Sequence, residues 1–252
     1  MIQATKHLLI LGGTAEASEL ARRVAVTIGN RVRVTTSLAG RRAQAPALPG
    51  GVRIGGFGGV GGLVDYLNQN AVDLVIDVTH PFSAVISDHA NAAAEAAGVP
   101  RLQLLRPPWQ LPPAAEWIEA DDLTDAARNL PRFARRVFLT TGARGLEAFS
   151  GLDDIWFLVR LIDPPAEPPP LARHQLITGN PPYGLEDERA IFADHNIDTL
   201  VSKHSGGDGT AAKILAAAEL GVKIVLIRRP PPEPGPAAET VDDALAWLEE
   251  KL

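Results

Sequence analysis

An apolar strand that runs through two glycines into a helix opens this chain. Residues 7–13 read HLLILGG, and residues 15–29 follow with the apolar spacing of an amphipathic helix that Gly29 ends. Uninterrupted apolar residues are typical of a strand buried on both faces of a sheet. The turn at Gly12 and Gly13 lies between this strand and the helix N-terminus, which is a place where phosphate can bind.

The same alternation of strand and helix continues to the end of the chain. Strands are expected within residues 31–37, 51–57, 72–80, 99–107, 155–163, 198–207 and 222–230, helices within 60–71, 81–98, 184–197, 209–221 and 240–252, and both within 116–130 and 135–149. Residues 164–175 are rich in proline and are expected to form a loop. Alternating strands and helices of this length indicate parallel, doubly wound sheets.

The second half of the chain repeats the α/β style of the first half. We therefore predict an α/β fold with two Rossmann-like lobes, each a parallel sheet with helices on both faces, and an active site in the cleft between them. The N-terminal lobe is expected to span residues 1–130 and to bind the cofactor, and the C-terminal lobe residues 131–252 and to bind the substrate. An alternative for the proline runs is polyproline recognition, although they fall where loops are needed anyway.

Composition and charge exclude several classes of function. The 252 residues are 46% apolar and 21% charged, as in a globular protein. The formal net charge of −6 argues against nucleic acid as a partner, because phosphate backbones attract basic surfaces. The absence of cysteine excludes disulfides and thiolate nucleophiles. No apolar run reaches about 18 residues and no signal peptide is apparent, so we expect a cytoplasmic protein with no membrane partner.

Metal and nucleophilic-serine chemistry have no support in the motifs. The histidines are scattered, without an H-x-x-x-H or H-E-x-x-H pair, and no G-x-S-x-G motif occurs. The acidic residues within 184–197 are typical of a solvated helix face. We therefore expect no metal site.

The first glycine turn is a candidate cofactor site. Gly12 and Gly13 allow the backbone to approach a phosphate, and Thr14 offers a hydroxyl donor beside the positive end of the helix dipole. The turn lacks the full G-x-G-x-x-G fingerprint, and any turn from strand to helix favours glycine. A purely structural role therefore stays open.

The end of the second strand favours NADPH over NADH. NAD-preferring sites carry an acid about 20 residues after the glycines, where it binds the ribose 2′-hydroxyl. This chain has Ser37, Arg41 and Arg42 in that region and no Asp or Glu. An arginine can grip a 2′-phosphate with two hydrogen bonds. The alternative is a solvated pair of arginines on the surface.

A second glycine cluster follows the third strand. Residues 55–62 read GGFGGVGG, and Gly56 and Gly58 could let the pyrophosphate or a ribose approach the backbone. A mobile loop is an equally good interpretation of this cluster.

The most apolar strand ends in a motif that can carry chemistry. Residues 77–83 read DVTHPFS, at the sheet edge where open α/β folds place their ligands. Thr79 and His80 are expected to face the cleft, and Pro81 to lie in the first turn of the next helix. The positive end of that helix dipole would favour a neutral imidazole.

Five motifs, taken in order and spacing, resemble those of the precorrin-6A reductases of cobalamin biosynthesis. They are LLILGGTAEA at residues 8–17, SLAGR at 37–41, DVTHPF at 77–82, TTGARGLEAF at 140–149 and VSKHSGG at 201–207. The resemblance covers nearly the whole chain. It implies a two-lobed, NADPH-dependent oxidoreductase that reduces one double bond of a tetrapyrrole, converting precorrin-6A to precorrin-6B. Cobalt-precorrin-6A reductases share these motifs and are the alternative.

Two positions depart from the pattern of that family. His204 stands where an asparagine is expected, so an imidazole replaces an amide. Residues 180–183 read NPPY where R-G-P-F is expected, so an arginine is missing and Tyr183 replaces phenylalanine. If that arginine held a substrate carboxylate, another cation must replace it.

The substrate that the resemblance implies is a flat ring edged with carboxylates, which requires a locally positive site. Candidate substrate-binding residues are Arg144, Arg160, Lys203, His204, Ser205 and Gly206. The loop at residues 203–207 and the helix N-terminus after it are expected to form an anion cradle. We expect hydride transfer from NADPH to a ring carbon, and protonation of the neighbouring carbon by His80, Lys203 or a bound water. His80 and Lys203 are thus the candidate catalytic residues.

Two other functions were weighed against this interpretation. A reductase or epimerase of small metabolites often has Tyr-x-x-x-Lys, and neither Tyr66 nor Tyr183 has a lysine four residues later. A non-catalytic NADP(H)-sensing Rossmann protein would explain the first lobe but leave the motifs at 140–149 and 201–207 without a purpose. The resemblance also leaves room for hand-over of the ring between neighbouring pathway enzymes.

Overall fold

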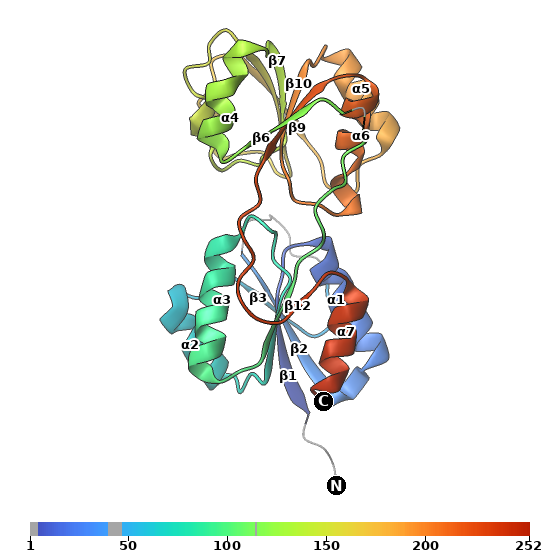
Figure 1. The fold of residues 1–252 in the computed structure, drawn as a ribbon. Coiled ribbons are helices and arrows are strands. Elements are labelled where there is room, and N and C mark those ends of the chain that lie inside the picture. The colour runs from blue at the N-terminus through green and yellow to red at the C-terminus, as the bar shows by residue number, and fades with distance from the viewer. Residues whose placement is uncertain (1–4, 40–46, 114) are drawn as a thin grey trace. The chain divides into compact units, whose positions relative to one another are not determined.

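The chain forms two compact units, each built on a six-stranded sheet (Figure 1). The computed structural model describes residues 5–39, 47–113 and 115–252. The first unit contains the residues up to Pro107 together with Pro230–Leu252, and the second unit contains Pro108–Arg229. All strand pairs in both sheets are parallel among the residues described.

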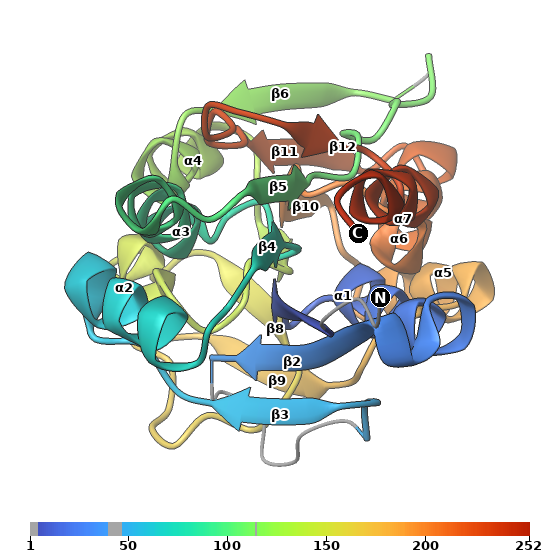
Figure 2. The ribbon, with the colours of Figure 1, turned by 90° about the horizontal axis from the view of Figure 1, so that it is seen from below.

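The first unit has its strands in the order β12-β5-β4-β1-β2-β3, and Figure 2 shows β3 at one edge of this sheet. The strands are β1 (Lys6–Leu11), β2 (Val32–Leu38), β3 (Gly51–Ile54), β4 (Leu74–Asp77), β5 (Arg101–Leu104) and β12 (Ala237–Ala238). Helices α1 (Ala15–Thr27) and α7 (Val241–Glu250) cover one face, and α2 (Gly59–Gln69) and α3 (Ala84–Ala97) cover the other (Figure 1). The 3-10 helix η1 (Gly29–Arg31) follows α1.

The packing of β1 on both of its faces explains why its sequence does not alternate between apolar and polar residues. Leu8 and Ile10 pack into the core beneath α1 and α7, whereas Leu9 and Leu11 pack into the core beneath α2 and α3. Because successive side chains point to opposite faces, a central strand with helices on both faces needs apolar residues at every position. The buried strand predicted from residues 7–13 is confirmed.

The second unit has the strand order β6-β11-β10-β7-β8-β9. The strands are β6 (Trp117–Ala120), β7 (Arg136–Leu139), β8 (Trp156–Leu161), β9 (His174–Thr178), β10 (Thr199–Lys203) and β11 (Lys223–Ile227). The helices are α4 (Leu123–Asn129), α5 (Leu185–Asp194) and α6 (Ala212–Glu219), with 3-10 helices η2 (Leu130–Arg132), η3 (Leu146–Phe149) and η4 (Asp208–Thr210). The predicted α/β class, with parallel sheets and helices, is confirmed.

The two sheets exchange their terminal strands. The sixth strand along the chain, β6, pairs with β11 in the second sheet, and the last strand, β12, pairs with β5 in the first. The division into units therefore differs from the predicted one, because residues 108–130 belong to the second unit and residues 230–252 to the first. Hydrogen bonds decide this assignment, such as that from the Gln103 N–H to the Pro236 carbonyl at 3.0 Å. A local apolar pattern does not indicate which sheet a strand joins.

Three local elements also differ from the sequence-based expectation. Strand β9 (His174–Thr178) was not expected, and its first two residues fall in the predicted loop; it forms by parallel pairing with β8 that begins at Phe157 and His174. The helix expected around residues 145–149 is the short η3. Helix α3 begins at Ala84 rather than near Pro81. None of the helices in the described part of the chain combines the length and apolar character that a membrane span requires.

Candidate functional site

The carboxyl ends of four neighbouring strands in the first unit are joined by hydrogen bonds. The Gly12 N–H donates to the Ser37 carbonyl at 2.9 Å, which links the β1 turn to β2. The Thr14 hydroxyl donates to the Val78 carbonyl at 2.7 Å, which links the same turn to the end of β4. Arg53 at the end of β3 donates to the Ser37 hydroxyl at 3.3 Å. The loops predicted to bind the cofactor thus share one edge of the sheet.

The glycine turn after β1 combines close packing at Gly12 with uncovered backbone at Gly13. A Cβ on Gly12 would lie 3.1 Å from Cγ2 of Thr36 and 3.3 Å from Cβ of Ala17, so glycine allows the strand and helix to pack closely. Gly13 has φ +112°, and a Cβ there would meet nothing within 4 Å. The backbone at Gly13 is therefore uncovered by the described residues, beside the N-terminus of α1.

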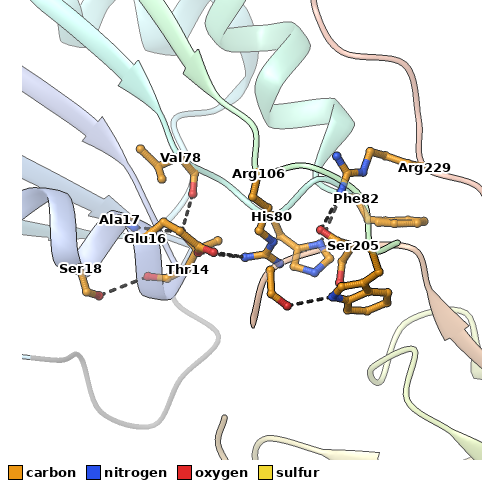
Figure 3. A network of polar contacts seen from close by, with 12 residues as sticks. Thr14, Glu16, Ala17, Ser18, Val78, His80, Phe82, Arg106, Ser205 and Arg229 are labelled. Carbon is orange, nitrogen blue, oxygen red and sulfur yellow. Dashed lines mark hydrogen bonds and ion pairs between the residues drawn. The ribbon is translucent and has the colours of Figure 1, made fainter. Parts of the chain in front are cut away.

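Thr14 has a structural task that differs from the predicted one. Its hydroxyl proton goes to the Val78 carbonyl, and its oxygen accepts the Ala17 N–H at 3.1 Å as the N-cap of α1 (Figure 3). A hydroxyl has one proton, so this proton is not available to a phosphate. Thr14 instead holds the turn in place, between the end of β4 and the first turn of α1.

An ion pair beside this turn was missed by the sequence analysis. Both carboxylate oxygens of Glu16 lie 2.9 Å from Nη1 of Arg106 (Figure 3). Glu16 is in the first turn of α1, where a carboxylate is favourable to the helix but repels a bound phosphate. Arg106 follows β5 and offsets that charge. No local pattern relates the two residues, which are 90 positions apart.

Thr79 also uses its hydroxyl in a hydrogen bond to a neighbouring residue at the end of β4. Oδ1 of Asp77 accepts the Thr79 N–H at 3.0 Å and the Thr79 hydroxyl at 2.7 Å. Asp77 is fully buried, and its Oδ2 has no hydrogen-bond partner among the residues described. The Thr79 oxygen lies 3.2 Å from the Ser87 hydroxyl of α3. Thr79 therefore fixes the backbone that presents His80, and its proton is not directed to a cofactor.

The structure fixes the orientation of the His80 ring. Its Nδ1 accepts the Phe82 N–H at 3.2 Å, so the neutral imidazole carries its proton on Nε2. The Ser83 N–H donates to the His80 carbonyl at 2.7 Å and closes a turn through Pro81 and Phe82. This turn is why α3 begins later than expected, since proline favours the second position of such a turn. His80 is half-buried and suited to proton transfer through Nε2.

The loop after β10 in the second unit is held by two residues outside its motif. Arg229 donates to the Ser205 carbonyl at 2.8 Å (Figure 3) and to the His204 carbonyl at 3.2 Å. The indole Nε1 of Trp109 donates to the Gly207 carbonyl at 2.8 Å. The backbone needs glycine here, because Gly206 and Gly207 have φ +68° and +81°. Trp109 and Arg229 were not predicted, and the only sequence signal was a tryptophan among prolines.

The contacts of His204 and the structure of the residues after the loop differ from the predicted anion cradle. Nε2 of His204 lies 3.2 Å from the Trp109 carbonyl, and the two rings stack with centroids 6.0 Å apart. The loop runs into η4 rather than directly into a helix N-terminus, and α6 begins only at Ala212. Asp208 lies in η4, so a carboxylate stands where the helix dipole was expected. Lys203 ends β10, and Ser205 is buried.

Arg160 is paired within the second unit. Its Nη1 lies 2.8 Å from Oε1 of Glu188, and the two side chains are 6% and 1% exposed. The guanidinium also covers the ring of Tyr183, 3.9 Å from its centroid. Burial raises the pKa of Tyr183, and the Arg160 cation opposes this. Arg160 is neutralised and enclosed, so it differs from the free substrate-binding cation that the sequence suggested. Arg144 is exposed after β7.

The predicted site residues thus fall into two sets, one in each unit. Gly12, Gly13, Thr14, Ser37, Gly56, Gly58, Thr79 and His80 lie at strand ends of the first unit, and Arg144, Arg160, Lys203, His204, Ser205 and Gly206 at strand ends of the second. Arg41 and Arg42 lie outside the described residues. Within residues 5–39, 47–113 and 115–252, no group of three or more His, Asp or Glu side chains could hold a metal ion.

Comparisons with known proteins agree with the sequence motifs. The family model "Precorrin-6x reductase CbiJ/CobK" matches residues 7–249. Over 248 residues, 96% of this chain and 97% of the relative, the chain is 47% identical to the precorrin-6A reductase of Rhodococcus erythropolis. It is 43% identical over 244 residues to that of Mycobacterium tuberculosis, with 96% and 97% covered. It is 26% identical over 257 residues to the cobalt-precorrin-6A reductase of Priestia megaterium, again with 96% and 97% covered.

A solved structure confirms the fold. The structure titled "CobK precorrin-6A reductase" superposes with a TM-score of 0.91 at 38% sequence identity, covering 98% of this chain and 97% of that one. At this identity and coverage, the likeness extends over both units. The chain belongs to the precorrin-6x reductase family.

Proposed function

We propose that this protein reduces precorrin-6A to precorrin-6B with NADPH as the hydride donor. The observation that carries the proposal is the match over nearly the whole chain to proteins named precorrin-6A reductase. The metal-free ring is favoured because identity to the Rhodococcus erythropolis protein is 47%, against 26% to the cobalt-precorrin-6A reductase of Priestia megaterium. Location in the cytoplasm and hand-over of the ring to other enzymes stay predictions.

The first unit fits a nicotinamide dinucleotide. The uncovered backbone at Gly13 and the N-terminus of α1 would hold the pyrophosphate. Ser37 is the last residue but one of β2, in the place where NAD-preferring sites carry an acid, and with Arg41 it would bind the 2′-phosphate. Gly56 and Gly58 would border the adenosine, since a Cβ at either position meets nothing within 4 Å. The bound cofactor supplies the hydride.

The chain's own residues would bind the ring and supply a proton. The protein carries a net charge of −6, so a ring with many carboxylates must meet local cations. Lys203 and Arg144 are the candidates in the second unit, with Ser205 and Gly206 in the loop after β10. His80 holds its neutral-form proton on Nε2 and is the first candidate donor, with Lys203 second.

Cofactor titration followed by turnover tests this proposal. The purified protein is titrated with NADPH and NADH, and metal-free precorrin-6A is then added while cofactor absorbance is followed. Tight NADPH binding and loss of absorbance are expected. Loss of absorbance only with the cobalt-bearing ring would assign the cobalt route, and binding without turnover of either ring would favour the NADP(H)-sensing alternative.

Variants of the two candidate proton donors test the catalytic assignment. His80→Ala should lower kcat by about 10²- to 10⁴-fold, the usual contribution of general-acid catalysis, with NADPH affinity unchanged. Lys203→Ala should lower both kcat and the affinity for the ring. Full turnover by both variants would contradict the assignment.

A further inference from the structure

Arg53 lies at the strand end where the adenosine ribose is expected. It is in β3, directly beside Ser37 of β2 in the parallel register (Figure 2 shows the two strands as neighbours). Ser37 is in turn held to the glycine turn through the Gly12 N–H. Arg53 is thus two hydrogen bonds from the proposed pyrophosphate site, and it joins Ser37 from the side opposite to β1.

The guanidinium of Arg53 carries a charge that no acid offsets. Its Nη1 donates to the Gly55 carbonyl at 2.5 Å and to the Ser37 hydroxyl at 3.3 Å, and its Nη2 donates to the Gly56 carbonyl at 2.6 Å. Among the residues that the structure describes, no Asp or Glu forms an ion pair with Arg53. The segments outside that description contain no acidic residue either.

Two aromatic rings fix the plane of this guanidinium. Its central carbon lies 3.8 Å from the centroid of Phe57 and 5.3 Å from that of Tyr66, and the two rings meet edge to face at 5.2 Å. Stacked arginines lose less freedom on binding a ligand, and their N–H groups point in set directions. Arg53 is only half-buried, so the group remains accessible from the solvent.

We propose that Arg53, together with Ser37, binds the 2′-phosphate of NADPH and sets the preference for NADPH over NADH. A half-buried, stacked guanidinium with free charge suits a phosphate dianion, which accepts paired hydrogen bonds from it. The open space beside Gly55 and Gly56 gives such a group room. The inference rests on the proposed function for the choice of cofactor, and it adds a residue that the sequence motifs did not indicate.

Binding of oxidised cofactors tests the role of Arg53 without any turnover. NADP⁺ and NAD⁺ differ only in the 2′-phosphate, so calorimetric titration of both isolates its contribution. Arg53→Gln should lower the affinity for NADP⁺ about 10- to 100-fold, because hydrogen bonds to a charged group are lost. It should lower the affinity for NAD⁺ by less than about 3-fold. Arg53→Lys keeps the charge but not the paired donors, so its affinity for NADP⁺ should lie between those of the unaltered protein and Arg53→Gln.

Arg33 provides the matched control. It lies in the opposite half of β2, where its Nη2 donates to the Asn70 carbonyl at 3.1 Å and lies 2.9 Å from Nδ1 of His7. Arg33→Gln removes the same charge from the same sheet and should leave the ratio of NADP⁺ to NAD⁺ affinities unchanged. Arg41→Ala shows whether this residue, which follows β2 in the sequence, adds to the preference.

Three results would overturn the proposal. Equal weakening of both cofactors by Arg53→Gln would mean that Arg53 only shapes the loop at Gly55 and Gly56. Unchanged affinities for both cofactors in Arg53→Gln would remove Arg53 from the site, and where that variant does not fold, the same result in Arg53→Lys decides. Equal binding of NADP⁺ and NAD⁺ by the unaltered protein would exclude a 2′-phosphate site. Strong NADP⁺ preference without turnover of precorrin-6A would instead contradict only the reductase assignment.

Discussion

The two units share one strand order but use their carboxyl edges differently. In the first unit, Gly13 leaves backbone uncovered and Arg53 has no acidic partner among the described residues. In the second unit, Arg160 is enclosed with Glu188, and the loop after β10 is held by Trp109 and Arg229. The same topology therefore carries uncovered backbone and an arginine without an acidic partner in one unit, and a braced loop in the other. Strand order positions the loops, and the side chains after each strand decide the chemistry.

Removing one acid from each unit should give the largest difference. Glu188→Ala leaves the buried Arg160 cation unpaired and should lower the free energy of unfolding by about 3–5 kcal/mol. Glu16→Ala breaks a pair whose side chains are 15% and 23% exposed, and should cost about 1 kcal/mol or less.

Urea unfolding measures both changes. Tryptophan fluorescence reports mainly on the second unit, which contains Trp109, Trp117 and Trp156, whereas Trp247 lies in the first. A loss for Glu188→Ala as small as that for Glu16→Ala would show that Arg160 reaches solvent, and the contrast between the units would be wrong.

Alanine at one glycine in each unit should separate cofactor binding from substrate binding. Gly13 has φ +112° and Gly207 has φ +81°, so alanine at either position strains the backbone by about 1–3 kcal/mol. Gly13→Ala also covers the backbone that a phosphate would approach, so it should lower the affinity for NADP⁺ about tenfold or more. Gly207→Ala should change the affinity for NADP⁺ by no more than about twofold and should lower the affinity for the tetrapyrrole ring. Equal loss of NADP⁺ affinity in both variants would contradict separate sites.

The smallest effects concern pH, and they have opposite directions in the two units. Burial lowers the pKa of His7 in the first unit, with the Arg33 cation adding to this and the Asn70 carbonyl opposing it. The folded imidazole binds its proton less readily than the unfolded one, so stability is lost as pH falls from about 6.5 through the lower folded pKa. Burial raises the pKa of Tyr183 in the second unit, so stability is lost as pH rises above about 10.

Stability measured against pH in two variants checks these slopes. His7→Gln should reduce the loss on the acid side, and Tyr183→Phe should reduce the loss on the alkaline side. Unchanged slopes in both variants would show that other groups control the pH dependence. Between the two transitions, near neutral pH, neither variant should change how the free energy of unfolding depends on pH.

Much of the local structure could be predicted from the sequence. Apolar runs and glycines located β1, β4 and the helices after them, because burial on both faces and the end of a helix depend on neighbouring residues. His174–Thr178 was missed, since a short strand at a sheet edge is half-exposed and has no distinctive apolar pattern. Motif spacing was sufficient to identify the family, which the comparisons confirm.

Local patterns in the sequence were enough to locate the strand-turn-helix units, to identify the family, and to place the candidate site residues at strand ends. Tertiary structure alone decided that β6 and β12 change sheets, and that the protons of Thr14 and Thr79 are already engaged. It also placed Arg53 against Ser37. The physical reason is that elements follow from local periodicity, whereas strand pairing and hydrogen-bond partners depend on groups that are distant in sequence and meet only in the folded chain.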